Sequence, residues 1–253
     1  MYPRQTVDIA MQLSRIGVLD RENAQICGVS IKSIRHWRYG TRRNPANSRR
    51  ASHCPRCDGE ALDGAAYAYL LGLYLGDGCL TKYRKGVYML NVACCNDWPG
   101  LMDAAQIAMS AVMPASKVSR RAKQGCTSVN SYSKHWPCLF PQHGAGRKHT
   151  RRIILEPWQQ AIVDEFPGPF ARGLFHSDGY RGLNRIKHSL PSGDRLYAYP
   201  RYLFVNQSAD IRAMCGQALD ELGVAWRYSK QNTISVARRK AVARLDQFVG
   251  PKY

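Results

Sequence analysis

The sequence has few acidic residues for its length and lacks a long hydrophobic segment. Only 18 aspartates and glutamates accompany 37 lysines and arginines, so the formal net charge is +19 at pH 7. The longest apolar run, 65–75, is shorter than the roughly 20 residues that a membrane span needs. The N-terminus carries no secretory signal, and the basic residues are spread along the chain rather than gathered on one amphipathic helix. We therefore expect no membrane association and a polyanionic partner, with nucleic acid as the first choice.

The cysteines also lack the pattern of a disulfide framework. There are nine of them, an odd number, at irregular spacings. In a chain without a secretory signal, this favours free thiols or a metal site in a reducing compartment. We expect a cytoplasmic protein, associated with the nucleoid if the source is bacterial.

Two similar segments stand out against this background. Residues 70–78 read LLGLYLGDG and residues 171–179 read ARGLFHSDG. Each predicts an apolar helix that ends in Asp-Gly and carries small residues four positions apart, where they share one helix face and allow two backbones to approach closely. The small residues that would form this helix interface are Gly72, Gly76, Gly173 and Ser177.

Packing these helices side by side would bring Asp77 and Asp178 together at their C-terminal ends. A carboxylate is unfavourable at a helix C-terminus by about 0.3–1 kcal/mol, and two neighbouring carboxylates also repel each other. Divalent cations would offset both costs, and carboxylates combined with water and phosphate oxygens suit Mg²⁺. The two motifs therefore predict a metal site, with Mg²⁺ or Mn²⁺ as the cofactor.

At these residues the sequence resembles the LAGLIDADG homing endonuclease family, in its single-chain form with two motifs. The resemblance extends from residue 64 to the C-terminus and maps the family's catalytic acids onto Asp77 and Asp178. Leu75 and His176 stand where the family pattern has its first acid. The resemblance implies an α+β fold with two pseudo-symmetric αββαββα halves, 64–150 and 151–253, whose saddle-shaped antiparallel sheets lie across the major groove of double-stranded DNA. It also implies a monomer with internal pseudo-two-fold symmetry.

The hydrophobic pattern agrees with two such halves. In the first half we expect helices at 65–76 and 101–113 and strands at 80–83, 87–94, 117–123 and 126–132. In the second half we expect helices at 170–177, 209–222 and 240–249, with strands at 180–187, 202–206, 226–229 and 233–237. Lys123 and Lys230 end the third strand of each half in a similar local sequence. They are candidates either to stabilise charge on the phosphate during cleavage or simply to contact the DNA backbone.

Residues 1–40 predict a small helix-turn-helix unit. Asp20 and Ser30 are candidate helix caps, and Val7, Ala10, Met11 and Ile16 suit one helix face. Basic residues remain for the outer face of the last helix, and others alternate along the strands of the main domain. Each of these residues could instead belong to a merely solvated face. The candidate DNA contacts are Lys32, Ser33, Arg35, His36, Arg38, Lys82, Arg84, Arg120, Arg181, Arg185, Lys187 and Arg227.

Between these regions, residues 41–63 form a basic linker that contains a C-x-x-C motif. Cys54 and Cys57 could supply two thiolates to a tetrahedral zinc ion, which needs a second pair of ligands. The candidates lie in 134–149, and we expect Cys138 and His143 to complete a Cys₃His site. The alternatives are two unliganded cysteines or, less well supported, a redox motif, because no thioredoxin-like strand and helix surround it.

The function that these features predict is metal-dependent cleavage of double-stranded DNA at a specific sequence. One alternative is a DNA-binding transcription regulator without catalysis. Some regulators join a LAGLIDADG body to a helix-turn-helix but have lost the acids, whereas this chain keeps both and has the two parts in the opposite order. A second alternative is a maturase that binds RNA and assists splicing.

Overall fold

The structure, a computed structural model, describes residues 2–39, 53–190, 193–250 and 252. It divides into two compact units, an N-terminal unit of residues 1–52 and a main unit of residues 53–253. Each unit is described by itself. Most of the predicted basic linker, residues 41–52, lies outside the described residues.

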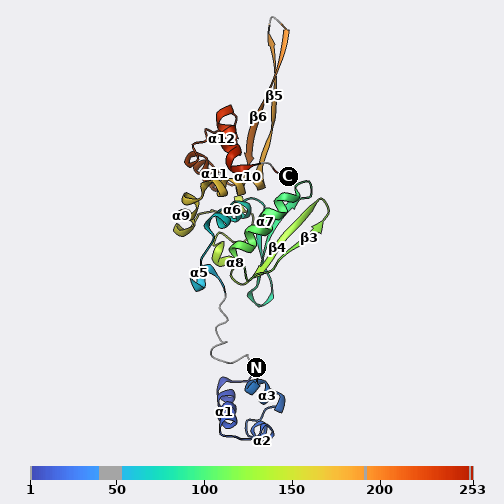
Figure 1. Cartoon of the computed structure of the whole chain (residues 1–253), viewed down its shortest axis with the longest axis vertical. Coiled ribbons are helices and arrows are strands. Elements are labelled where there is room, and N and C mark those ends of the chain that lie inside the picture. Colours follow the sequence, from blue (N-terminus) through green and yellow to red (C-terminus); the bar gives the residue numbers. More distant parts are fainter. Residues whose placement is uncertain (1, 40–52, 191–192, 251, 253) are drawn as a thin grey trace. The chain divides into compact units, whose positions relative to one another are not determined.

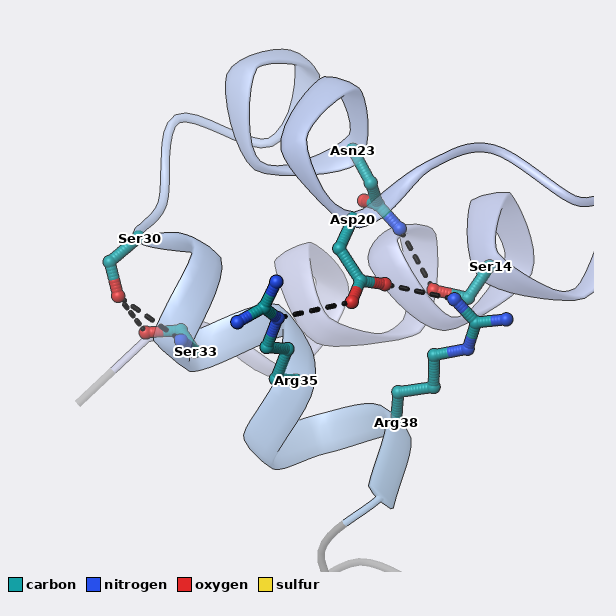
Figure 2. A network of polar contacts seen from close by, with 7 residues as sticks. All are labelled: Ser14, Asp20, Asn23, Ser30, Ser33, Arg35 and Arg38. Carbon is teal, nitrogen blue, oxygen red and sulfur yellow. Dashed lines mark hydrogen bonds and ion pairs between the residues drawn. The ribbon is translucent and has the colours of Figure 1, made fainter.

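The described part of the N-terminal unit contains three helices, α1 (Arg4–Arg15), α2 (Asp20–Ile26) and α3 (Ile31–Tyr39). A small core of Ala10, Ala24 and Ile34 holds one residue from each helix. A buried amide adds polar contacts, because the Asn23 side chain donates to the Ala10 carbonyl at 2.7 Å. It also donates to Ser14 Oγ at 2.9 Å, the contact that Figure 2 shows. Burying three helices against one another stabilises elements that are individually too short to persist in water.

The helix ends differ in part from the sequence prediction. Ser30 begins α3 as expected, since its Oγ accepts a hydrogen bond from the Ser33 backbone N–H at 3.1 Å. Asp20 does not cap α2: the N-cap is Leu19, and Asp20 is the first helical residue. Ile16 does not join the core, because α1 ends at Arg15 and leaves the Ile16 side chain exposed.

The main unit consists of two halves with the same order of elements, as the sequence predicted. In the first half these are α6 (Gly64–Leu75), β1 (Gly78–Lys82), β2 (Tyr88–Cys95), α7 (Pro99–Val112), β3 (Val118–Lys123), β4 (Cys126–Ser133) and α8 (Trp136–Leu139). In the second half they are α10 (Pro167–Asp178), β5 (Gly179–Leu190), β6 (Gly193–Val205), α11 (Ala209–Glu221), β7 (Arg227–Lys230), β8 (Thr233–Val236) and α12 (Arg239–Val249). Shorter elements are α5 (Pro55–Asp58), η2 (Arg84–Gly86), η3 (Lys148–Thr150) and the unpredicted α9 (Pro157–Glu165).

Each half folds its strands into one sheet. Within the described residues there are two four-stranded antiparallel sheets, ordered β1-β2-β4-β3 and β5-β6-β8-β7. The two orders are equivalent, which confirms the predicted α+β fold of two αββαββα halves. Helices cover one face of each sheet and form a single core with it, and α6 and α10 lie together at the centre of the unit (Figure 1).

The second sheet contains the largest difference from the prediction. Strand β6 begins at Gly193 rather than at residue 202, so β5 and β6 form a long hairpin that extends beyond the rest of the main unit (Figure 1). This stretch contains Pro200, which has no backbone N–H to donate to a neighbouring strand. In the structure Pro200 pairs with Leu183 of β5, whereas β8 pairs only with Tyr202–Val205. The proline therefore lies where β6 has a single neighbour, a position at which a missing N–H is tolerated.

Candidate functional site

The two motif helices pack against each other at their small residues. A methyl group added at Gly72 would lie 2.5 Å from the Phe170 carbonyl oxygen, and one added at Gly173 would lie 2.2 Å from the Tyr69 carbonyl oxygen. These atoms belong to the backbone of the facing helix, so only glycine permits the observed approach. One turn further on, a methyl group added at Gly76 would lie 2.1 Å from Ser177 Oγ.

This close packing brings the two acids to the same end of the helix pair. Asp77 follows Gly76, the C-cap of α6, and Asp178 is the last residue of α10. A methyl group added at Gly76 would lie 3.1 Å from Asp178 Oδ2, so the carboxylate of the second helix reaches the end of the first. Apolar helix packing thus delivers both carboxylates to one place, although helix ends and mutual repulsion both disfavour negative charge there.

The pKa of Asp178 is raised by its surroundings at the helix ends. Burial raises the pKa of its carboxyl group to about 6, and the nearby charge of Asp77 contributes in the same direction. A hydrogen bond from Asn206 Nδ2 to Asp178 Oδ2, 2.6 Å long, partly offsets the rise by favouring the ionised form. Burial also raises the pKa of Asp77, whose side chain is the more exposed of the two.

The two acids differ in their asparagine neighbours, because Asn206 donates a hydrogen bond to Asp178. Asn206 follows β6 directly, and the residue at the corresponding position after β2 is Asn96. The Asn96 side chain accepts a hydrogen bond from Thr127 Oγ1 at 2.9 Å instead of reaching an acid. The sequence analysis did not single out either asparagine, because neither belongs to a repeated motif.

Two lysines, Lys148 and Lys252, occupy equivalent positions at the helix ends. Lys148 Nζ donates to the carbonyl oxygens of Gly76 at 2.8 Å and Gly78 at 2.6 Å, and also to that of Tyr74. Lys252 Nζ donates to the carbonyl of Gly179 at 2.6 Å, with a longer contact to that of Ser177 at 3.3 Å. Each ammonium group therefore neutralises the negative end of the motif helix in its own half.

Both lysines also interact with the acids. The two ammonium groups lower the pKa of Asp77 and of Asp178, against the effect of burial. Burial in turn lowers the pKa of Lys148 to about 8, which leaves this group mainly protonated at pH 7, and it lowers the pKa of Lys252. The site thus contains two carboxylates and two ammonium groups in a partly dehydrated setting.

An open groove of about 460 Å³ adjoins the site. It reaches the acid of the second half and basic residues from the η3 region. Its lining includes Gly76, Arg147, Lys148, His149, Asp178 and Asn206. The groove thus combines the positive charge of Arg147 and Lys148 with the carboxylate of Asp178.

The sequence analysis suggested two different lysines, Lys123 and Lys230, as candidates to stabilise charge on the phosphate near the acids. Lys123 and Lys230 lie at the exposed ends of β3 and β7. Neither is among the cations that lower the pKa of the two acids, a role that belongs to Lys148 and Lys252. The repeated sequence around Lys123 and Lys230 reflects equivalent strand ends. Their two predicted roles, stabilising charge on the phosphate or contacting the DNA backbone, stay predictions.

A pH-dependent stability follows from the raised pKa of Asp178. Because the folded-state pKa of about 6 exceeds the unfolded value of 3.8, the folded protein binds the extra proton between these values and loses stability as the pH rises through them. We expect Asp178→Asn, without added Mg²⁺, to be about 1–3 kcal/mol more stable than the wild type at pH 7.5. The gain should shrink to a few tenths of a kcal/mol near pH 3.5 and vanish below about pH 3, where the wild-type carboxyl is protonated in both states.

Urea unfolding at several pH values measures this difference. The matched control is Asp97→Asn, which removes the charge of an exposed aspartate and should change stability by less than about 0.5 kcal/mol. A stability gain for Asp178→Asn that did not depend on pH would show that burial of the charge is not its cause.

The candidate DNA contacts on the first sheet divide between its two faces. Arg120 shares the helix-covered face with its strand partner Val129, and it bonds Asp103 at 2.5 Å and Gln106 at 2.8 Å, both on α7. Arg121 and Lys123 alternate onto the opposite, exposed face. Of the other candidates in this half, Lys82 is the last residue of β1, whereas Arg84 lies in η2 and not on a strand as the alternation had suggested.

The second sheet shows the same division. The guanidinium of Arg181 makes two hydrogen bonds to Asp246 of α12, at 2.7 and 2.9 Å, on the helix-covered side. Arg185 and Lys187 continue on that side along the hairpin beyond the helices, and Lys187 pairs with Asp194 at 2.5 Å. The open face carries Arg227 and also Arg201, which donates to Ser235 Oγ at 2.8 Å. The sequence analysis did not single out Arg201.

In the N-terminal unit, two of the candidate contacts are held by an acid. Asp20 bonds Arg38 at 2.9 Å and Arg35 at 3.4 Å, as Figure 2 shows. Ser33 contacts Ser30, while Lys32 and His36 are exposed on α3. Asp20 thus fixes the two arginines on one side of α3 and leaves Lys32 and His36 facing solvent.

Cysteines from two distant segments meet at the start of the main unit. Cys54 and Cys57 flank Pro55 and Arg56 at the start of α5, and Cys138 lies on α8. The fourth ligand atom comes from His135, not from the predicted His143, and the four ligand atoms all lie within 4.8 Å of one another. The His143 ring packs edge-on against Tyr88 instead, with ring centroids 5.6 Å apart.

Comparison with known proteins gives matches among solved structures only; no protein-family model and no curated protein matches the chain. I-DmoI in complex with DNA and Mn matches at 14% identity and a TM-score of 0.49, covering 75% of this chain and 99% of that chain. The N-terminal LAGLIDADG domain of DUF199/WhiA matches at 12% and 0.46, covering 80% and 89%.

The LAGLIDADG meganuclease I-AabMI bound to uncleaved DNA matches at 10% identity and a TM-score of 0.44, covering 72% of this chain and 84% of that chain. These are structures of the family that the two motifs resemble. At such identities and TM-scores the likeness carries no argument about function, which has to rest on the side chains of this chain.

In the described part of the chain, no helix has the length and apolar character needed to cross a membrane.

Proposed function

We propose that the chain is a sequence-specific endonuclease that cleaves double-stranded DNA, using divalent cations held by Asp77 and Asp178. The observation that carries the proposal is the convergence of these two acids at the ends of two helices in backbone contact. A packed helix pair needs no carboxylates at this end, where they are electrostatically unfavourable. Their presence in both halves supports a role in binding cations.

The residues of the site fit Mg²⁺ or Mn²⁺. The available donors are carboxylate and carbonyl oxygens, which hard divalent cations prefer. The raised pKa of Asp178 shows that its negative charge is incompletely compensated by Asn206, Lys148 and Lys252. When bound between Asp77 and Asp178, the cation would supply Lewis-acid stabilisation of a phosphodiester and a more acidic water.

The side chains of this chain perform the remaining tasks. Asp77 and Asp178 fix the cations relative to the two DNA strands, one acid from each half. Lys148 and Lys252 place positive charge beside the acids, where it can stabilise the additional negative charge that develops on phosphorus. Asn206 orients Asp178 through its hydrogen bond, so the second carboxylate keeps a fixed direction.

Affinity for DNA would come from the open faces of the two sheets. Arg121 and Lys123 lie on the first open face, and Arg201 and Arg227 lie on the second. Their contacts with phosphates and base edges would position the duplex over the two acids. The N-terminal unit, with Lys32 and His36 exposed on α3, would add a further contact and lengthen the recognised site.

The test is selection of cleaved sites from a random duplex library with the full chain and Mg²⁺. The proposal predicts that a defined sequence is cut on both strands with a fixed stagger. Recovery of one duplex that is bound tightly but never cut, with either Mg²⁺ or Mn²⁺, would contradict catalysis and favour a DNA-binding regulator. Preferential binding of structured RNA would favour a maturase.

A further inference from the structure

The cysteine and histidine cluster stands apart from the acids and has no role in the proposed cleavage. It joins a Cys-x-x-Cys at α5 to a His-x-x-Cys at α8. Helix α5 has only four residues, too few to be stable without an external attachment. Cys54 is nevertheless completely buried. Something other than helix formation must therefore hold this segment against α8.

The contacts between the two segments include sulfur–sulfur and sulfur–nitrogen contacts. Cys57 Sγ lies 3.6 Å from Cys138 Sγ and 3.4 Å from His135 Nδ1, and Cys138 Sγ lies 3.9 Å from the same nitrogen. Neutral thiols are weak donors and weak acceptors, so these contacts alone would contribute little to stability. The Arg56 guanidinium over the Trp158 ring, 4.5 Å from its centroid, adds one cation–π contact nearby.

The same distances match the ligand shell of a single tetrahedral ion. Zinc bonds of about 2.3 Å to sulfur and about 2.0 Å to nitrogen place two sulfur ligands about 3.8 Å apart, and sulfur and nitrogen about 3.6 Å apart. The observed distance between the two sulfurs, 3.6 Å, is slightly shorter than the ideal one. The two observed distances from sulfur to nitrogen, 3.4 and 3.9 Å, lie on either side of the ideal one. Three of the donors, those of Cys57, His135 and Cys138, therefore already have the spacing that a metal ion would require, and Cys54 Sγ lies within 4.8 Å of each of them.

The donor types select the metal. Three thiolates and one imidazole suit Zn²⁺, whereas Mg²⁺ and Ca²⁺ prefer oxygen ligands. All four coordination positions would be taken by protein, which is the arrangement of a structural zinc site and leaves no place for a substrate. Asp58 supports the loop, since its carboxylate accepts a hydrogen bond from the Cys54 backbone N–H at 3.3 Å.

We propose that Cys54, Cys57, His135 and Cys138 bind one structural Zn²⁺ ion that fastens residues 53–58 to α8. The ion attaches the first described segment of the main unit to its first half. The two sheets and the packed motif helices have their own core and do not depend on this attachment. Loss of zinc should consequently release the segment and leave the rest of the main unit folded.

The experiment measures zinc in the full chain, purified without chelator from cells supplied with zinc. We expect about one zinc per chain in the wild type, and less than about a tenth of that in Cys57→Ser and in His135→Ala. His143→Ala is the matched control, because it removes a neighbouring histidine that packs on Tyr88, and it should keep its zinc. Reconstitution with Co²⁺ should give the visible absorption of a tetrahedral thiolate complex in the wild type and in His143→Ala.

Near-ultraviolet circular dichroism and thermal unfolding show whether each variant is folded. If Cys57→Ser or His135→Ala is unfolded, removal of zinc from the wild type by a chelator, followed by readdition of Zn²⁺, replaces that variant. Absence of zinc from the wild type, retention of zinc by both variants, or a Cys57–Cys138 disulfide in its place would overturn the proposal. Loss of zinc from His143→Ala but not from His135→Ala would overturn the assignment of the fourth ligand.

Discussion

Replacing either acid by its amide should abolish double-strand cleavage while DNA binding persists. Asp77→Asn and Asp178→Asn keep the shape of the side chain but remove the charge that would hold the cations, so we expect each to lower the cleavage rate at least about a thousandfold, or about 4 kcal/mol. Binding of the same duplex should be unchanged or tighter, because affinity comes from basic side chains and the mutation removes negative charge that faces DNA.

The measurement uses the duplex recovered by library selection, with cleavage followed in Mg²⁺ and binding followed in Ca²⁺. Asp97→Asn, a charge change at an exposed aspartate of the main unit, is the control and should cut at the wild-type rate. If both amide variants cleaved as fast as the wild type, the helix-end acids would not be the catalytic groups. If the wild type bound the duplex without cutting it, the acids would have no catalytic role.

The same assay separates the lysines at the helix ends from those at the strand ends. We expect Lys148→Met and Lys252→Met to slow cleavage by about tenfold to a thousandfold, since their ammonium groups lie beside the acids. Lys123→Met and Lys230→Met should affect mainly the affinity for DNA and its dependence on salt. The reverse result would support Lys123 and Lys230 as the groups that stabilise charge on the phosphate.

The sequence predicted the helix pair well because the relevant information is local. Small residues four positions apart, followed by Asp-Gly, specify both a close packing face and the position of the acid, and the repetition of this pattern in two places indicates that the helices face each other. The hydrophobic pattern placed most of the strands, whereas the arrangement of two equivalent sheets was implied by the resemblance that the two motifs carry. The helix pair therefore followed from the spacing of the motif residues, and the fold class followed from the family resemblance.

Lys148 and Lys252 could not be recognised in this way. Lys148 lies in the short η3 helix and Lys252 follows α12, each far in sequence from the motif that it contacts. Their role depends on carbonyl oxygens at a helix end that no side-chain pattern reveals. The sequence also could not assign each basic strand residue to a sheet face without knowing its acidic partners. Arg120 and Arg181 lie on the helix-covered faces, where they donate hydrogen bonds to Asp103 and Asp246.

The fourth metal ligand is a different case, since a signal for it was available. His135 and Cys138 are three positions apart, a spacing that places both side chains on one face of a helical turn. His143 lies five positions beyond Cys138, outside that turn. Applying the helix period to this short segment would have favoured His135, whereas counting nearby histidines did not.

The second large effect is expected at the contact between the motif helices. In Gly173→Ala the new methyl group would lie 2.2 Å from the Tyr69 carbonyl oxygen, and in Gly72→Ala it would lie 2.5 Å from that of Phe170. Neither neighbour is a flexible side chain, so the helices must separate. We expect each substitution to reduce the free energy of unfolding by about 3 kcal/mol or more, measured by urea denaturation.

Gly144→Ala is the matched control for this prediction. Its methyl group would lie 3.4 Å from Arg151 Nη1, an ordinary contact with a flexible side chain, so its stability should stay within about 1 kcal/mol of the wild type. Because Asp77 and Asp178 are carried by the same two helices, Gly173→Ala should also lose cleavage more steeply than it loses DNA binding. A Gly173→Ala protein with wild-type stability and cleavage would mean that the helices are further apart than the structure places them, and that the acids do not act as a pair.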